Sequence, residues 1–521
     1  MSTVRKPLVL VTVCLAALSI NLDTTIVNVA VPDLSAALDA GTRQLLWIVD
    51  GYNLAFAALV LAMGSLSDRF GRRPALLLGL AGFGLSSAVA ALAQNAEQLI
   101  ALRFVMGAFA ALIFPTTLSI IANTFTERTE RAAALGAWGA ATGMGVALGP
   151  VTGGWLLEHF TWHAVFWALV PVAVLAIAMT VAFVPESRDP AVPRLDLPGL
   201  GISVAALGLL TYTIIEGPEH GWSSTATLTG FAGAALLIGV FVAVERRVAH
   251  PMLDVRLFSD PRFSAASGAV TIAFFSLFGF IFLITQYFQL LREYSPLGAG
   301  ARTIPVAASI AVASVLGGLL GPRLGAKTVV TLGLTLLGSS FLWISTSEVT
   351  TSYPTVIVPQ MILMGLGLGM VSTVAAESIL QTLPPARAGV GSAVNDATRE
   401  LGGTLGVAVI GSVFSSVYAS RLGELLDGAR LPAEQLRAAQ ESVGVANALG
   451  ARMPEVRSAL ETAFMDGLAT GCLVIGSLCL LGALGALVAL PGRRWMAAHE
   501  AAGHAAPDVP AAVPAAVPAE A

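Results

Sequence analysis

Fourteen runs of mostly apolar residues, each about 20 residues long, constrain this chain more than any other feature. They are centred near residues 19, 54, 84, 111, 144, 174, 207, 235, 275, 312, 337, 363, 404 and 479. A helix of that length spans the hydrocarbon core of a bilayer. The composition agrees, because 56% of the 521 residues are hydrophobic and 12% are charged, whereas soluble domains average about 45–50% and about 25%. The sequence therefore predicts an all-α integral membrane protein with fourteen spans.

The first apolar run is a retained span in our interpretation. It follows Arg5 and Lys6 and extends to about Ala30, with Asp23 inside it, so it is too long and too acidic for a cleaved signal peptide.

The three cysteines all lie inside apolar runs: Cys14, Cys472 and Cys479. We interpret them as small buried residues without disulfide or metal roles.

The basic residues indicate the orientation. With the N-terminus inside, 18 of the 28 lysines and arginines fall in inner segments, eight fall in outer segments, and Arg103 and Arg399 lie within spans. Cytoplasmic segments carry the excess of positive charge in membrane proteins. We therefore expect a multi-pass membrane protein with both termini in the cytoplasm.

A short loop between the second and third runs carries four charges. Its marked positions are Gly64, Asp68, Arg69, Gly71, Arg72 and Arg73. A carboxylate beside guanidinium groups can latch two helices together, and opening at this end would then break the latch. The alternative is that the arginines only fix the topology, for which neither Asp68 nor the glycines are needed.

A weak repeat of this loop divides the chain. Residues 318–327 resemble residues 64–73, with Gly325 at the place of Gly71 but Pro322 at the place of Asp68. The repeat implies two six-span halves. The predicted divisions are a first half at 8–190, an inserted pair of spans at 196–247, a second half at 260–490 with an outer loop at 419–466, and a disordered Ala/Pro tail at 500–521.

Charged residues also lie inside the spans. Asp23 is in the first run, Asp50 in the second and Arg103 in the fourth. Such residues are costly in a bilayer and usually face a cavity or a partner. Desolvation favours the neutral form of a carboxyl group, so both aspartates are candidate proton carriers, and Arg103 needs one of them as a counter-charge. The alternative for Asp50 is an interfacial position at the outer mouth.

Asp396, Arg399 and Glu400 in the thirteenth run share one helix face, because they are three and four residues apart. Either they neutralise one another within the helix, or Glu400 faces a cavity opposite Asp23, where it would suit a cationic substrate.

The fifth run contains a spaced set of small residues: Gly145, Gly149, Pro150, Gly153 and Gly154. Small residues at this spacing allow helices to approach closely, and the proline removes a backbone donor.

These features resemble the fourteen-span drug:proton antiporter branch of the major facilitator superfamily. The resemblance covers about residues 8–490 and rests on the charged loop, the Asp23 and Arg103 runs, the run at 395–411 and the glycines of the fifth run, which are similar to the antiporter motif of exporters. One departure is Met106, where this family usually has glutamine.

The resemblance implies a fold and an activity. The fold would have two six-helix halves and two inserted helices, and the protein would lie in a bacterial inner (plasma) membrane. The activity would be secondary transport and not an enzyme reaction: a monomer would exchange protons for lipophilic, cationic drugs by alternating access, using the charged residues named above. The proton gradient would drive it without a cofactor, and the chain contains neither a nucleotide-binding loop nor a zinc-type cluster. Its partners would be the lipid bilayer, protons and small molecules, but not nucleic acid.

Two other interpretations remain open at this point. A dedicated exporter of one endogenous metabolite, such as an antibiotic, a siderophore, an amino acid or a lipid, would carry the same motifs. A membrane sensor or scaffold that transports nothing is a more distant alternative, against which the cost of the intramembrane charges argues.

Overall fold

The computed structural model describes most of the chain. The described residues are 5–188, 196–248, 251, 253–382, 388–427 and 431–490. The predicted tail at 500–521 lies outside them.

Helices make up nearly all of the described chain, and no strand occurs among the described residues. The helices are α1 (Arg5–Leu38), α2 (Thr42–Phe70), α3 (Arg72–Ala90), α4 (Ala96–Thr124), α5 (Arg128–His159), α6 (His163–Trp167), α7 (Leu169–Phe183), α8 (Leu197–His220), α9 (Thr225–Glu245), α10 (Pro261–Gln286), α11 (Pro296–Ala301), α12 (Ile304–Leu324), α13 (Ala326–Ile344), α14 (Val358–Gln381), α15 (Ala388–Leu425), α16 (Ala433–Glu441), α17 (Val443–Gly450) and α18 (Pro454–Ala489). Short 3₁₀ or π turns complete the elements: η1 (Val255–Ser259), η2 (Tyr287–Leu291) and η3 (Tyr353–Ile357).

The helices account for the predicted spans. Thirteen described segments are long and apolar enough to cross a membrane, some of them joining neighbours such as α6 with α7 and α11 with α12. Helix α5 has 32 residues, which at 1.5 Å each give about 48 Å and make it long enough to be the fourteenth. The predicted all-α membrane fold is confirmed, and the fourteen-span count agrees with these thirteen segments together with α5.

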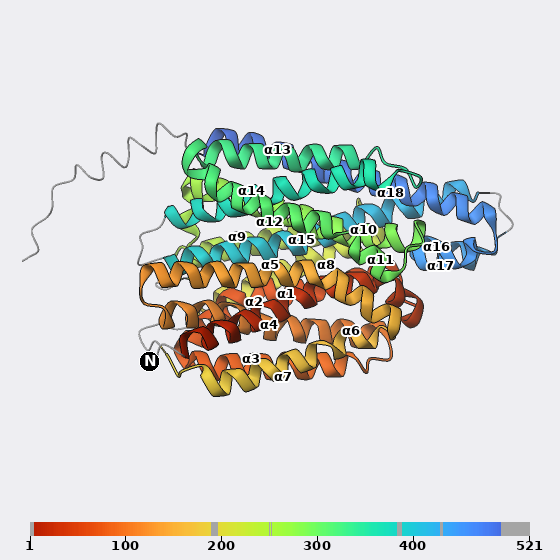
Figure 1. Ribbon diagram of the computed structural model, residues 1–521. Helices are drawn as coiled ribbons and strands as arrows, with labels where there is room; N and C mark the ends of the chain where they lie inside the picture. The colour runs from red at the N-terminus through yellow and green to blue at the C-terminus, as the bar shows by residue number, and fades with distance from the viewer. Residues whose placement is uncertain are drawn as a thin grey trace, which may run out of the picture.

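The long helices run side by side in one bundle (Figure 1). Helices α1–α7 lie in the lower part of the view, and α13, α14 and α18 lie at the top. Across the middle, α2 packs against α15 and α5 packs against α11, while the inserted helix α8 contacts both α2 and α15. We call the end of the bundle that carries α16 and α17 the distal end, and the end where α1 begins the proximal end.

The segment predicted as an outer loop at 419–466 is largely helical. Helix α15 continues to Leu425, α16 and α17 follow, and α18 begins at Pro454. These helices are tied to the first half by polar contacts at the distal end. The Ser35 hydroxyl lies 3.3 Å from that of Ser442, and the Thr42 hydroxyl donates to the carbonyl of Glu441 at 3.0 Å.

The charged loop at the proximal end turns the chain from α2 into α3. Gly71 has φ of +118°, a conformation that side-chain-bearing residues rarely adopt. Arg72 Nε lies 2.6 Å from Asp68 Oδ1, so the ion pair joins the end of α2 to the start of α3. The Arg73 guanidinium donates to the carbonyl of Val181 at 2.7 Å, which adds α7 to the contact. Gly325, at the repeated position between α12 and α13, also has positive φ, +86°.

The glycines of α5 allow it to pack closely on two helices. A Cβ atom at Gly145, Gly149 or Gly153 would meet α1, whereas one at Gly154 would meet the backbone of α11 in the other half. Helix α5 continues without a break through Pro150. The spaced small residues therefore determine both a contact inside the first half and a contact between the halves.

We predict that Gly149→Ala destabilises the protein and that Gly143→Ala does not. A Cβ at Gly149 would overlap the Thr25 side chain and lie 3.1 Å from the Ile26 nitrogen, whereas nothing lies within 4 Å of one at Gly143. Overpacking of this kind costs about 1–3 kcal/mol, while alanine in an open helix position is favourable. Thermal unfolding in detergent measures both, and equal melting temperatures would contradict the packing argument.

Candidate functional site

A buried ion pair joins α1 to α4 near the middle of the first half. Arg103 Nη1 lies 2.7 Å from Asp23 Oδ2, and the side chains are 1% and 0% exposed. The Arg103 Nε also donates to the Ile48 carbonyl of α2 at 2.9 Å, and the guanidinium lies 4.4 Å from the centre of the Tyr52 ring. Arg103 therefore has the counter-charge that its depth in the fourth span requires. That counter-charge is Asp23 and not Asp50.

This pair is only partly satisfied. Among the described residues, Asp23 Oδ1 has no hydrogen-bond partner although it is buried. Removing a carboxylate from water is costly, and an oxygen without a partner adds to that cost. An ionised carboxylate can accept more bonds than Arg103 supplies. Asp23 therefore keeps one acceptor atom for a proton, a cation or a water molecule.

Asp50 of α2 is not part of the Asp23–Arg103 ion pair. Its side chain is fully buried, and within the described chain neither carboxylate oxygen has a hydrogen-bond partner; the same holds for both polar atoms of the Asn53 amide. Leu46, one turn before Asp50, packs on Gly411 of α15. Asp50 is thus buried beneath the distal end and does not lie at an exposed mouth.

The register of α2 and α15 shows which residue of α15 lies level with Asn53. The two helices run in opposite directions, so seven residues after Leu46 and seven before Gly411 bring Asn53 level with Thr404. The Thr404 hydroxyl is also buried without a partner among the described residues. The register therefore puts two unsatisfied polar side chains, Asn53 and Thr404, at about the same depth, one turn below Asp50.

A second charged group lies on α15. Arg399 Nε lies 3.3 Å from Glu400 Oε1, and Arg399 Nη2 donates to Asn21 Oδ1 on α1 at 2.8 Å. The guanidinium also lies 5.5 Å from the Phe114 ring centre and 5.1 Å from that of Phe274. Arg399 therefore both pairs with its neighbour in the helix and reaches across to the first half.

Asn21 is the contact of α1 with the charged group on α15. This amide stands two positions before Asp23 and accepts from Arg399, so α1 carries both a member of the first ion pair and a contact to the second. Asp396 is buried one turn before Glu400. The sequence analysis did not name Asn21 as a site residue. Its position close to an intramembrane carboxylate could have marked it as a candidate.

The charged loop at 64–73 is not part of this group. Its ion pair and its bond to Val181 lie at the proximal end and involve α2, α3 and the end of α7. Gly64 lies in the adjoining turn of α2, where a Cβ atom would be 3.3 Å from Pro115 of α4. The loop therefore braces the first half near one opening of the bundle.

The fold and this group of residues define a polytopic membrane protein with a charged, buried centre between two helical halves. The sequence profile of the Major Facilitator Superfamily matches residues 13–407. The chain belongs to this superfamily and is a transporter by family, not an enzyme.

Two relatives and one solved structure illustrate the similarity. The multidrug efflux pump LfrA of Mycolicibacterium smegmatis is 35% identical over 95% of this chain and 98% of its own. The methylenomycin A resistance protein of Streptomyces coelicolor is 34% identical over 76% of this chain and 83% of its own. A bacterial homologue of the human lysosomal transporter Spinster, solved inward-facing and unoccupied, shares the fold with a TM-score of 0.66 at 16% identity, covering 95% of this chain and all of that one.

We predict that breaking the Asp23–Arg103 pair from either side costs more than removing it whole. Asp23→Asn leaves a buried guanidinium without its counter-charge, and Arg103→Gln leaves a buried carboxylate; each should lower stability by about 3–5 kcal/mol. The double variant should lose less than the sum of the two. Thermal unfolding of the three variants measures the coupling.

Arg421→Gln is the matched control, because Arg421 pairs with Glu424 and Asp466 at the surface. It should leave the melting temperature nearly unchanged. Additive losses in the double variant would show that the buried pair is not a coupled unit.

Proposed function

We propose that the chain is a proton-coupled antiporter that exports lipophilic cations by alternating access. The observation that carries this proposal is two buried charged groups on facing halves: Asp23 with Arg103, and Glu400 with Arg399. The second group contacts α1 of the first half, where Arg399 donates to Asn21. Two carboxylates held by arginines near a contact between the halves can exchange protons and cations while sensing the position of both halves. A purely structural membrane protein would have no reason to bear the cost of these charges.

Competition for the carboxylates supplies the coupling. A proton on Asp23 or Glu400 removes the negative charge that attracts a cation and that holds the neighbouring arginine. A bound cation has the reverse effect and keeps the carboxylate ionised. Asp50 is the second candidate for a proton, because neither oxygen of its buried carboxylate has a hydrogen-bond partner among the described residues. Protons and substrate would therefore alternate at the same group of side chains.

The contacts between the halves are those expected for one state of an alternating-access cycle, the state in which the distal end is closed. Ser35 with Ser442, Thr42 with Glu441, and Gly154 with α11 all lie toward the distal end. The excess of basic residues supports a cytoplasmic position for the proximal end, in which case these contacts would close the outer side. Export would require them to separate while the proximal end closes, as in rocking of two halves around a central site.

The relatives support the direction and the substrate class. One is named a multidrug efflux pump and another a methylenomycin A resistance protein. Carboxylates at the centre favour positive charge, and the rings of Phe114 and Phe274 beside Arg399 offer surfaces for lipophilic and aromatic cations. We therefore place the substrate among lipophilic cations, moved outward across a bacterial inner membrane.

A dedicated exporter of one metabolite is the second candidate. The relative named for resistance to a single antibiotic favours it. The same charged groups would serve either protein, because proton coupling does not depend on how many compounds the protein exports.

We expect Glu400→Gln to abolish substrate-triggered proton movement. The change keeps the size of the side chain but removes its charge and its ability to take up a proton. In proteoliposomes with an imposed pH gradient, the intact protein should release protons when a cationic dye is added, and the variant should fall to the level of empty liposomes. Glu455→Gln, on the exposed start of α18, is the matched control. Full coupling in Glu400→Gln would remove Glu400 from the mechanism.

A panel of unrelated compounds decides between broad and dedicated export. Cells that express the intact protein should tolerate several lipophilic cations better than cells that express the uncoupled Glu400→Gln variant, because charge and lipophilicity do not specify one molecule. Growth inhibition across cationic dyes and neutral antibiotics measures this. Protection against one compound alone would favour the dedicated exporter.

A further inference from the structure

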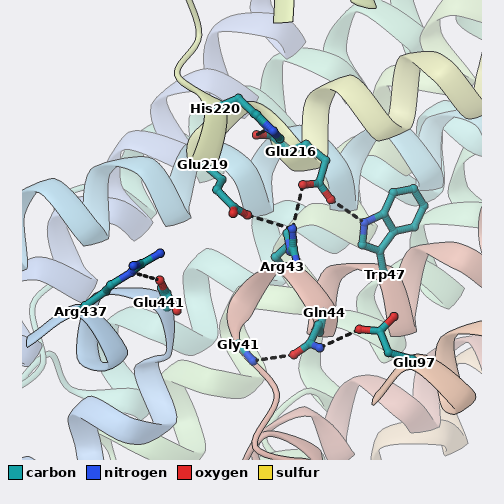
Figure 2. A network of polar contacts seen from close by, with 10 residues as sticks. All are labelled: Gly41, Arg43, Gln44, Trp47, Glu97, Glu216, Glu219, His220, Arg437 and Glu441. Atoms are coloured by element: carbon teal, nitrogen blue, oxygen red, sulfur yellow. Dashed lines mark hydrogen bonds and ion pairs between the residues drawn. The ribbon is translucent and has the colours of Figure 1, made fainter. Parts of the chain in front are cut away.

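A cavity of about 730 Å³ opens at the distal end of the bundle, between α2, α8, α15 and α16. It belongs to neither half alone, because the inserted helix α8 forms one of its walls. Figure 2 shows several charged side chains in and beside it, among them Arg43, Glu216, Glu219, Arg437 and Glu441. Its volume lies within the range of about 300–1,000 Å³ that is typical of small-molecule sites.

Arg43 of α2 is held by two carboxylates of α8. Its Nη1 lies 3.0 Å from Glu216 Oε2 and 2.9 Å from Glu219 Oε2. Trp47 Nε1 donates to the other oxygen of Glu216 at 3.4 Å. Glu216 is buried, whereas Arg43 and Glu219 are about half exposed toward the cavity that they line. Glu219 can therefore exchange Arg43 for another cation, while Glu216 stays in place.

The balance of charge around the cavity is negative. Its lining includes three carboxylates, from Asp39, Glu219 and Glu441, and two guanidinium groups, from Arg43 and Arg437. Arg437 is paired with Glu441 at 2.9 Å, and Arg43 is shared with the buried Glu216 behind the wall. An anion would meet guanidinium groups that already have partners, whereas a cation finds surplus carboxylate charge.

The cavity also has an apolar side. Leu46, Ile215 and Pro218 line it together with the polar residues. A site with one apolar wall and a few charged groups fits a molecule that is itself both lipophilic and charged. Trp222, in the turn after α8, donates to the Ser416 hydroxyl of α15 at 3.0 Å, so the wall formed by α8 is anchored to the second half as well.

We infer that this cavity is a second binding site for lipophilic cations, at which an exported cation displaces Arg43 from Glu219 before it leaves the protein. The inserted pair α8 and α9 then has a role in transport, because α8 supplies the two carboxylates of the site. The displacement also loosens the tie between α2 and α8 at the end that must open. This inference rests on the proposed function for the direction of transport, but not for the binding itself.

Two single substitutions change the charge of this site in opposite directions. Arg43→Gln removes the competing guanidinium, and Glu219→Gln removes an exposed carboxylate. With tetraphenylphosphonium as the probe, equilibrium binding to the purified full chain in nanodiscs should become about threefold tighter in the first variant and about threefold weaker in the second, the size expected for one partly exposed charge. Glu455→Gln, exposed on α18, controls for net charge and should bind as the intact protein does.

Opposite shifts in the two variants would support the site, because a general loss of structure would weaken binding in both. Unchanged affinity in both variants, weaker binding in both, or no binding by the intact protein would overturn it. A cation held only at the central site would not touch Arg43 or Glu219, so the two substitutions should then shift its affinity by less than threefold, because salt partly screens these half-exposed charges. Binding is measured without a proton gradient, so a protein that binds as expected but moves no protons would contradict the proposed function alone.

Discussion

The hydrocarbon core of the membrane is the constraint on which the rest of this structure depends. Water is absent there, so backbone polar groups must be satisfied within each segment, and the chain responds with long helices throughout its described spans. The same condition applies to side chains. Asp23 and Arg103 are buried together at 2.7 Å because neither can be buried alone at an acceptable cost.

Packing between helices then depends on small residues, since lipid gives no hydrophobic drive for helices to associate. The glycines of α5 bring α1 close on one face, and Gly154 brings α11 close on another. The first contact positions Asn21 and Asp23, which α1 carries. The second helps to close the distal end between the halves. One helix thus links the central polar group to the contact that transport has to break.

Several features of the fold and the site followed from the sequence. Apolar run length predicted the spans, and the charged loop predicted a contact at the turn between α2 and α3, where Asp68 meets Arg72. The depth of Arg103 showed that it needed a carboxylate. The choice between Asp23 and Asp50 could not be made, because predicted depth in a span does not specify which face of a helix a side chain occupies or which neighbour that face meets.

The sequence by itself determined that this protein lies in a membrane, that it is helical, and to which family it belongs. It also identified the charged residues inside the spans, whose cost in lipid indicates a functional role. Tertiary structure decided which partners those residues have: Asp23 for Arg103, Asn21 for Arg399, and Glu216 of an inserted helix for Arg43. The physical reason is that hydropathy and charge are properties of single residues and their spacing. A partner across two halves is a property of helix rotation and register, which only close packing of the whole bundle fixes.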